Sequence, residues 1–222
     1  MPTPPRAVLF DLDGTLVDSA PDLCNAVNRV LAEEGRAAVP LARLRQVVSK
    51  GGRAMLAVAC PDLDEAAREA LLPRFLAHYA TALAVDSVLF DGVAELLAAL
   101  EAAGSTWGIV TNKPEYLARD ILPQFGWDTR CAVLIGGDTL PVRKPDPLPL
   151  IVAAERIGMA PADCVYVGDD ERDIVAARAA GMPSVVALWG YRLPGDHPQD
   201  WRGDTMVEQP QVLCAPGAWP VP

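Results

Sequence analysis

The sequence predicts an α/β fold in which a parallel sheet is covered by helices on both faces and a block of helices interrupts the chain after the first strand. Three observations lead to this prediction. Short apolar runs end abruptly in polar or glycine-containing turns, as buried strands of parallel sheets do. After residue 90 these runs alternate with amphipathic segments. Between residues 18 and 85, by contrast, the apolar residues show only helical spacing.

The first predicted strand covers residues 7–10, four apolar residues that run into Asp11, Asp13 and Gly14. A helical block follows it. Its first segment ends at Gly35, a typical helix terminator, and the next two cover about residues 41–48 and 64–79. Because no strand-like alternation interrupts this region, we expect a small helical bundle.

The second half of the chain returns to alternating strands and helices. Four apolar runs are predicted strands: residues 107–110, 132–135, 164–167 and 185–188. Helices are predicted over about residues 93–104, 115–125 and 147–157 and in the segment that leads to Gly181. The tail after about residue 190 is rich in Pro and Gly and weakly patterned. We therefore expect a core formed by residues 1–16 and 89–222, interrupted by a helical domain of residues 17–88.

Charge and composition indicate which kinds of partner and cellular location to expect for this protein. The 222 residues carry 19 Lys and Arg against 29 Asp and Glu, a formal net charge of −10, which disfavours nucleic acid as a partner. No apolar run approaches the roughly 20 residues that span a bilayer, and the first residues do not resemble a signal peptide. The five cysteines are dispersed and never form a C-x-x-C pair, as is typical of reduced thiols. We expect a cytoplasmic protein, monomeric or homodimeric.

Polar residues follow three of the predicted strands, at the sheet edge where α/β proteins bind ligands. They are Asp11 and Asp13, Thr111 and Asn112, and Asp169; Lys144 lies in a nearby polar loop. Asp11 and Asp13 leave the chain on one side because side chains of an extended segment alternate. Two such carboxylates repel unless a cation lies between them or one takes a proton. One can then attack a substrate while the other transfers protons; the alternative is a strand-end turn with a solvated second acid.

The run from Val8 to Ser19 resembles the first signature of the haloacid dehalogenase superfamily, in its phosphatase branch. The other signatures follow in the family's order: Thr111-Asn112, Lys144-Pro145, and the segment from Gly168 to Asp173. Taken singly, these are also ordinary features: a strand-end turn, a solvated loop lysine, and acids that favour a helix N-terminus. Together they imply a Rossmann-like, doubly wound core with an inserted helical cap and a bound Mg²⁺.

The resemblance also implies roles for individual residues. Asp11 would be the nucleophile, and Asp13 would protonate the leaving alcohol and then activate water. Thr111 and the Asn112 amide would hold the phosphoryl oxygens, and Lys144 would neutralise charge on the nucleophile and the phosphate. The metal ligands would be the Asp11 carboxylate, the Asp13 backbone carbonyl and Asp169. Asp173 would lie behind them and orient Lys144 or a metal-bound water.

The segment 49–56, expected between two helices of the cap, is the candidate for substrate selection. Gly51 and Gly52 allow close backbone approach to a ligand, and Lys50 and Arg53 are candidate contacts for an anionic group. The alternative is a flexible turn with solvated cations. The overall pattern is similar to bacterial phosphoglycolate phosphatases, so 2-phosphoglycolate is the first expected substrate. Residues 107–114 and the tail also resemble N-acetylmuramic acid 6-phosphate phosphatases. A sugar phosphomutase, or a binding protein without turnover, are the further alternatives.

Overall fold

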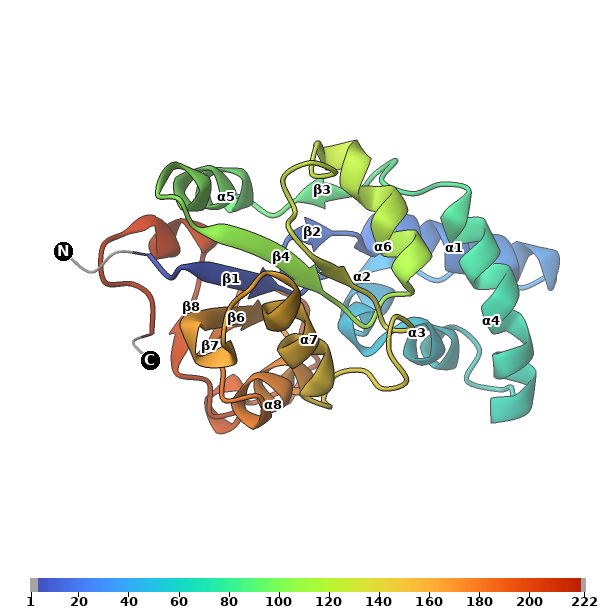
Figure 1. Cartoon of the computed structure of the whole chain (residues 1–222). Coiled ribbons are helices and arrows are strands. Elements are labelled where there is room, and N and C mark those ends of the chain that lie inside the picture. Colours follow the sequence, from blue (N-terminus) through green and yellow to red (C-terminus); the bar gives the residue numbers. More distant parts are fainter. Residues whose placement is uncertain (1–3, 221–222) are drawn as a thin grey trace.

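The centre of the molecule is a six-stranded parallel sheet, drawn in the computed structural model of Figure 1, which describes residues 4–220. Its strand order is β5-β4-β1-β6-β7-β8, and all neighbouring strands run parallel. The strands are β1 (Ala7–Phe10), β4 (Thr106–Val110), β5 (Leu134–Ile135), β6 (Cys164–Gly168), β7 (Ser184–Ala187) and β8 (Thr205–Val207). The predicted α/β fold with a parallel sheet is confirmed.

Helices cover both faces of this sheet, which explains why its central strands are continuously apolar. Val8 and Phe10 pack on one side, in a cluster with residues of α5 (Val93–Ala102) and α6 (Glu115–Ile121). Ala7 and Leu9 pack on the other side, with α7 (Leu148–Arg156) and α8 (Glu171–Ala179). All four residues of β1 are therefore fully buried.

The helical insertion lies beyond the carboxyl ends of the strands (Figure 1). It consists of α1 (Ala20–Glu33), α2 (Leu41–Arg45), the 3₁₀ turn η1 (Val48–Lys50), α3 (Gly52–Ala59) and α4 (Glu65–Ala80). These helices share a second apolar cluster, built mainly on α1, α3 and α4 and joined by Leu117 and Tyr191 of the core. At the two ends of the insertion, β2 (Val17–Asp18) pairs antiparallel with β3 (Val88–Leu89).

The structure corrects several sequence expectations. The segment expected between two helices contains a helix of its own, α3, because Gly51 takes the turn with a φ of 90° and Gly52 then starts the helix. The two-residue strands β2 and β3 are too short to show a pattern. Strand β8 lies in the weakly patterned tail and was missed because only Val207 of its three residues is buried. Of the predicted strand 132–135, only the last two residues form strand β5, although Ala132 and Val133 also hydrogen-bond to the backbone of β4.

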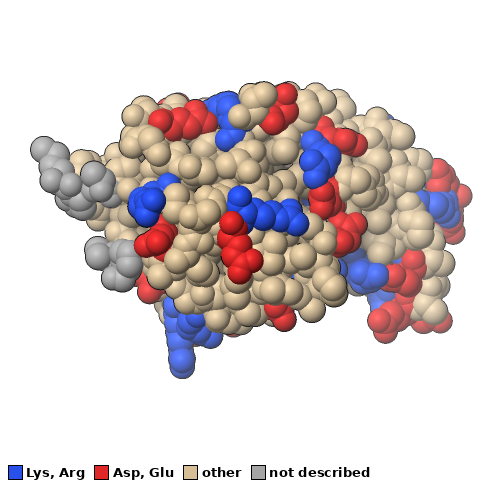
Figure 2. Space-filling model, in the orientation of Figure 1, with Lys and Arg blue, Asp and Glu red and all other residues tan. Residues whose placement is uncertain are grey.

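The remaining regular elements are short and connect the larger ones. They are the 3₁₀ turns η2 (Leu122–Phe125), η3 (Pro161–Asp163), η4 (Pro198–Asp200) and η5 (Pro210–Cys214). On the face drawn in Figure 2, basic and acidic side chains are interspersed, and no continuous basic surface forms there. Among residues 4–220, the helices are all too short or too polar to cross a membrane.

Candidate active site

The candidate site lies at the carboxyl edge of the sheet, where three neighbouring strands end. Strand β1 lies between β4 and β6 and is followed by Asp11. Thr111 follows β4, and Asp169 follows β6. The chain crosses from β1 to one neighbour and later to the other, so this is the topological switch point at which open α/β sheets bind ligands. The expected convergence of these residues is therefore present in the fold.

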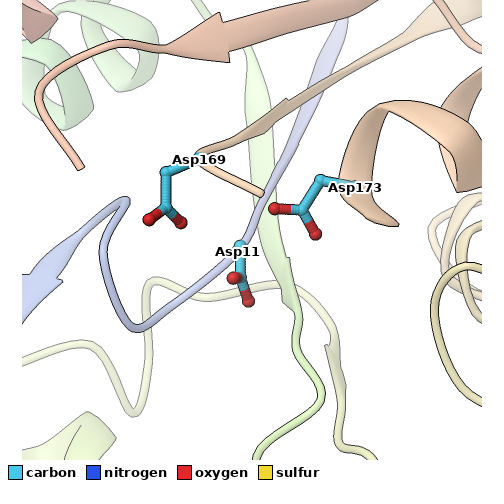
Figure 3. Close-up of side chains that lie close together, drawn as sticks. All are labelled: Asp11, Asp169 and Asp173. Carbon is cyan, nitrogen blue, oxygen red and sulfur yellow. The ribbon is translucent and has the colours of Figure 1, made fainter. Parts of the chain in front are cut away.

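Three carboxylates gather at this point. Asp11, Asp169 and Asp173 are all buried, and each offers an oxygen within 4.8 Å of the others. Figure 3 shows Asp11 between the other two, with Asp173 at the start of the next helix. Asp173 was expected only behind the metal ligands, but its carboxylate belongs to the same group. It also accepts a hydrogen bond from the backbone N–H of Asp170 at 3.1 Å, which fixes it at the start of α8.

Lys144 supplies the positive charge closest to this acidic cluster. Its Nζ lies 2.7 Å from Asp173 Oδ1 and 3.0 Å from Asp11 Oδ1, and it donates a hydrogen bond to the Tyr166 hydroxyl at 2.6 Å. Tyr166 in turn donates to the Val110 carbonyl at 2.7 Å, so the lysine is anchored to the sheet. Burial alone would lower the pKa of Lys144, but the charges of Asp11 and Asp173 raise it. Lys144 is therefore a fixed cation beside Asp11.

Asp169 is held by three donors from different parts of the chain. Thr15 Oγ1 donates at 3.2 Å, Ser49 Oγ at 2.7 Å and the backbone N–H of Tyr191 at 2.9 Å. Burial, followed by the nearby charges of Asp11 and Asp173, nevertheless raises the pKa of Asp169 well above its usual range. Burial also raises the pKa of Asp173, to about 7, although the charge of Lys144 acts to lower it.

The acidic cluster suits a hard divalent cation. One ammonium faces three buried carboxylates, so negative charge is in excess. Lys144 Nζ is 3.0 Å from Asp11 Oδ1, but this buried oxygen has no hydrogen-bond partner in the described part of the chain. Carboxylate oxygens are the ligands that Mg²⁺ prefers. The residues present therefore fit a metal ion held between Asp11 and Asp169.

The carboxylate of Asp13 lies outside the acidic cluster and has a different set of partners. Lys113 Nζ is 3.0 Å from both of its oxygens, and Ser19 Oγ donates to Oδ1 at 2.5 Å. Lys113 was not among the sequence candidates. The available signal was its place directly after Thr111 and Asn112, at the end of a predicted strand. The two aspartates of the D-x-D pair thus have separate lysines, Lys144 for Asp11 and Lys113 for Asp13.

Thr111 and Asn112 lie where a phosphoryl group would meet Asp11. The Thr111 hydroxyl is buried and accepts a hydrogen bond from the Lys113 backbone N–H at 3.3 Å. Asn112 donates through Nδ2 to the Lys144 carbonyl at 2.9 Å, while its Oδ1 is buried without a partner among residues 4–220. Both residues line a cavity of about 210 Å³, together with Asp11, Asp13 and Lys144.

The segment predicted to select substrate also lines this cavity, but its contacts differ from the expectation. Lys50 Nζ forms an ion pair with Asp170 Oδ2 at 2.8 Å, and Arg53 pairs at the surface with Glu69 of α4. A Cβ at Gly52 would lie 2.7 Å from Cε1 of Phe75, so this glycine permits α3 to pack on α4. Gly51 supplies the positive φ of the turn before α3. Both glycines thus have structural roles here, and both also line the cavity.

Asp170 joins the core to the helical insertion. It caps the N-terminus of α8, pairs with Arg172 at 2.8 Å and also forms an ion pair with Lys50. Burial opposes its ionisation, but Arg172 and Lys50 lower the pKa of Asp170. Arg172 further donates to the Ser49 carbonyl. The negative charge that the sequence places next to Asp169 is thus neutralised by cations from both parts of the chain.

Side chains of α3 and α4 line the part of the cavity that faces the helical insertion. Leu72, Phe75 and Leu76 of α4 and Met55 of α3 line it opposite Asp11 and Thr111. The site is therefore lined by carboxylates and lysines at the sheet and by mainly apolar side chains at the insertion. An arrangement of this kind suits a small anionic group at the sheet edge.

Comparison with known proteins agrees with this geometry. A model of the haloacid dehalogenase-like hydrolase family matches residues 8–187. A phosphoglycolate phosphatase of Xanthomonas campestris pv. campestris (strain 8004) is 67% identical over 218 residues, 98% of this chain and 99% of its own. An N-acetylmuramic acid 6-phosphate phosphatase of Pseudomonas putida is 45% identical over 209 residues, 94% of each chain.

A crystal structure shares the fold as well. It is described as a predicted phosphoglycolate phosphatase from Haemophilus somnus 129PT and superposes with a TM-score of 0.83. Its sequence is 30% identical, and the alignment covers 94% of this chain and 96% of that one. The family model covers most of the chain, and the resemblance read from the four sequence signatures is confirmed. This chain belongs to the haloacid dehalogenase-like hydrolase family.

Proposed function

We propose that this protein is a Mg²⁺-dependent phosphomonoesterase that works through an aspartyl-phosphate on Asp11. The observation that carries the proposal is the placement of Asp11 beside a buried ammonium and two further buried carboxylates, in the lining of the cavity. A phosphate dianion does not approach such a carboxylate cluster unless cations offset the repulsion. Lys144 supplies one cation there, and the acidic cluster supplies the ligands for another.

The metal would be held by the carboxylates of Asp11 and Asp169, together with the Asp13 backbone carbonyl that the family resemblance implies. Asp173 orients Lys144 through their 2.7 Å ion pair. When bound, Mg²⁺ supplies electrostatic stabilisation of the charge on the transferring phosphoryl oxygens. Thr111, the backbone amide of Asn112 and Lys144 would bind the same oxygens from the other side.

Two half-reactions then follow from the two aspartates. In the first, a carboxylate oxygen of Asp11 forms a bond to phosphorus while the bond between phosphorus and the leaving alcohol oxygen breaks; Asp13 gives that oxygen a proton. In the second, water attacks the phosphorus of the aspartyl-phosphate and Asp13 takes its proton. Phosphate leaves, and Asp11 is restored as a carboxylate.

The substrate that we propose is 2-phosphoglycolate, which would be split into glycolate and phosphate. The similarity to the phosphoglycolate phosphatase of Xanthomonas campestris supports it, since that protein covers nearly the whole chain at 67% identity. Lys50 and Arg53, with Gly51 and Gly52 between them, line the cavity and would help to select the leaving group. The alternative substrate is N-acetylmuramic acid 6-phosphate, because the Pseudomonas putida relative is 45% identical.

We further propose that residues 17–88 act as a cap on a core of residues 1–16 and 89–222. The antiparallel pair of β2 and β3 supports these boundaries, since both crossings between the two parts lie there. A cytoplasmic location accords with the dispersed cysteines, which are all free thiols.

A phosphate-release assay tests the proposed function. The purified protein, treated with EDTA and then given Mg²⁺, is assayed with 2-phosphoglycolate, N-acetylmuramic acid 6-phosphate and hexose phosphates. We expect Mg²⁺-dependent release with the highest kcat/KM for 2-phosphoglycolate. A higher kcat/KM for the muramic acid ester would assign the alternative substrate. Transfer of phosphate to another hydroxyl of a sugar, without release, would indicate a phosphomutase and refute the hydrolase proposal.

A further inference from the structure

We propose that Lys113 is a positioning residue for Asp13, and that Tyr79 of the helical insertion sets the position of Lys113. The inference rests on the proposed function, because it assigns Lys113 to the step in which Asp13 transfers a proton. It extends the site by two residues that the sequence signatures did not indicate. It also connects the proton-transferring carboxylate to the helices above it.

The contacts of Asp13 place Lys113 in this role. The ammonium lies 3.0 Å from both Asp13 oxygens, so it fixes the plane of the carboxylate as well as its distance. Ser19 Oγ holds Oδ1 from a second direction. Asp13 is thus held outside the cluster of Asp11, Asp169 and Asp173, and it lines the same cavity as Asp11.

Lys113 is itself fixed by Tyr79. Its Nζ donates to the Tyr79 hydroxyl at 2.9 Å and lies 4.3 Å from the centroid of the Tyr79 ring. With the two Asp13 oxygens, these contacts satisfy all three N–H groups of the ammonium. Burial raises the pKa of Tyr79 to about 12, so its hydroxyl remains neutral and accepts from the lysine. Tyr79 is nearly fully buried and stacks with Phe75 on α4.

Because the Lys113 side chain is buried, its ammonium depends on these partners. The Lys113 side chain is 4% exposed, and a buried ammonium is stable only when it is paired and hydrogen-bonded. Its two partners come from opposite walls of the cavity: Asp13 follows β1, and Tyr79 lies on α4. The ammonium is therefore fully satisfied only when the helical insertion is packed over the strand ends. Closure of the insertion and correct placement of Asp13 are coupled through this one side chain.

The chemical consequence concerns the leaving group. When Asp13 gives its proton to the departing alkoxide, it becomes a carboxylate directly beside Lys113, which stabilises the new charge. An alkyl alcohol needs that proton, whereas p-nitrophenolate leaves without it. Attack by water on the aspartyl-phosphate needs Asp13 as a base with either substrate. Loss of Lys113 should therefore slow proton transfer but spare the first bond-breaking step with an activated ester.

The test compares Lys113→Met with Lys113→Arg, Tyr79→Phe and the wild type. Arg130→Met serves as a matched control, because Arg130 pairs with Glu101 at the opposite end of the sheet. We expect Lys113→Met to lower kcat with 2-phosphoglycolate by about 10²-fold or more, with a much smaller change in KM. With p-nitrophenyl phosphate it should give a rapid burst of one p-nitrophenolate per enzyme and then slow turnover. Lys113→Arg should recover part of the rate.

Tyr79→Phe keeps the ring but removes the hydroxyl. It should lower kcat with 2-phosphoglycolate several-fold more than it lowers the burst rate with p-nitrophenyl phosphate. If Lys113→Met does not fold, as judged by circular dichroism, the same comparison in Tyr79→Phe decides the proposal. Equal rates for Tyr79→Phe and the wild type on both substrates would then overturn it.

Two other results would also overturn the inference. An equal loss of burst and turnover in Lys113→Met would show that Lys113 binds the phosphoryl group itself. Unchanged kinetics would show that Asp13 does not depend on it. Failure of the proposed function is distinguishable from both, because the wild-type protein would then form no phosphoenzyme with either ester.

Discussion

Replacing Lys144 with Met removes the only ammonium within hydrogen-bond distance of the acidic cluster among the described residues. Asp11 and Asp173 lose ion pairs of 3.0 and 2.7 Å, and neither gains access to solvent, since both are buried. The folded protein then has to neutralise one further carboxyl by binding a proton. In the unfolded chain such a carboxyl ionises at about pH 3.9. Keeping it protonated in the folded variant therefore costs about 1.4 kcal/mol of folding free energy for each pH unit above that value. The expected loss is therefore about 4 kcal/mol at pH 7 and about 1.5 kcal/mol at pH 5.

Urea unfolding of the EDTA-treated proteins at both pH values measures this loss directly. Arg130→Met, which removes an exposed cation, should lose less than about 1 kcal/mol at either pH. The electrostatic effect is recognised by the pH dependence of the difference in the free energy of unfolding between Lys144→Met and the wild type. A loss that is equal at pH 5 and pH 7 would refute the electrostatic reasoning and point to lost packing of the lysine stem. A loss below about 1 kcal/mol at pH 7 would show that water or a metal reaches the site freely.

Four further predictions test other parts of the site. Asp11→Asn should abolish phosphate release and phosphoenzyme labelling while circular dichroism stays unchanged, because an amide is not a nucleophile. Mg²⁺ should raise the Tm of the EDTA-treated wild type more at pH 7.5 than at pH 5. The folded-state pKa of Asp173, about 7, lies above its unfolded value, so the metal-free protein loses stability as pH rises from about 4 to 7. Lys50→Ala should change kcat/KM for 2-phosphoglycolate more than for p-nitrophenyl phosphate, since Lys50 lines the cavity from the insertion and pairs with Asp170 rather than with Asp11. Gly52→Ala should lower the free energy of unfolding by about 1–3 kcal/mol, because its Cβ would meet Phe75 at 2.7 Å.

Each of these predictions has an opposite outcome that counts against it. Substantial residual turnover of Asp11→Asn would remove the nucleophile from the scheme. A Mg²⁺ effect on Tm that is larger at pH 5 would contradict binding at ionised carboxylates. Equal losses of Lys50→Ala on both esters would assign the lysine to the chemistry or to the fold. Full stability of Gly52→Ala would mean that the Phe75 ring moves aside at little cost.

The sequence alone determined the class of fold and the acidic half of the site. A four-residue apolar run such as residues 7–10 can be recognised as a strand because β1 is buried on both faces. The polar residue that follows a strand, such as Asp11, Thr111 or Asp169, is also visible in the local sequence. Since parallel strands present their carboxyl ends at one edge, the convergence of these residues followed from local patterns. Lys144 was a candidate from its place in a polar loop, and its role beside Asp11 came from the resemblance of its motif to a known one.

Only the tertiary structure decided which groups the lysines of the site pair with. The contact of Lys113 with Asp13 joins residues 100 positions apart, and its contact with Tyr79 depends on how the insertion packs over the sheet. Likewise, Lys50 was expected to be available for substrate but is paired with Asp170. A lysine has the same local sequence signature whether it is solvated or buried. Its role depends on the groups that replace its water, and those groups come from distant segments that only the packed fold brings together.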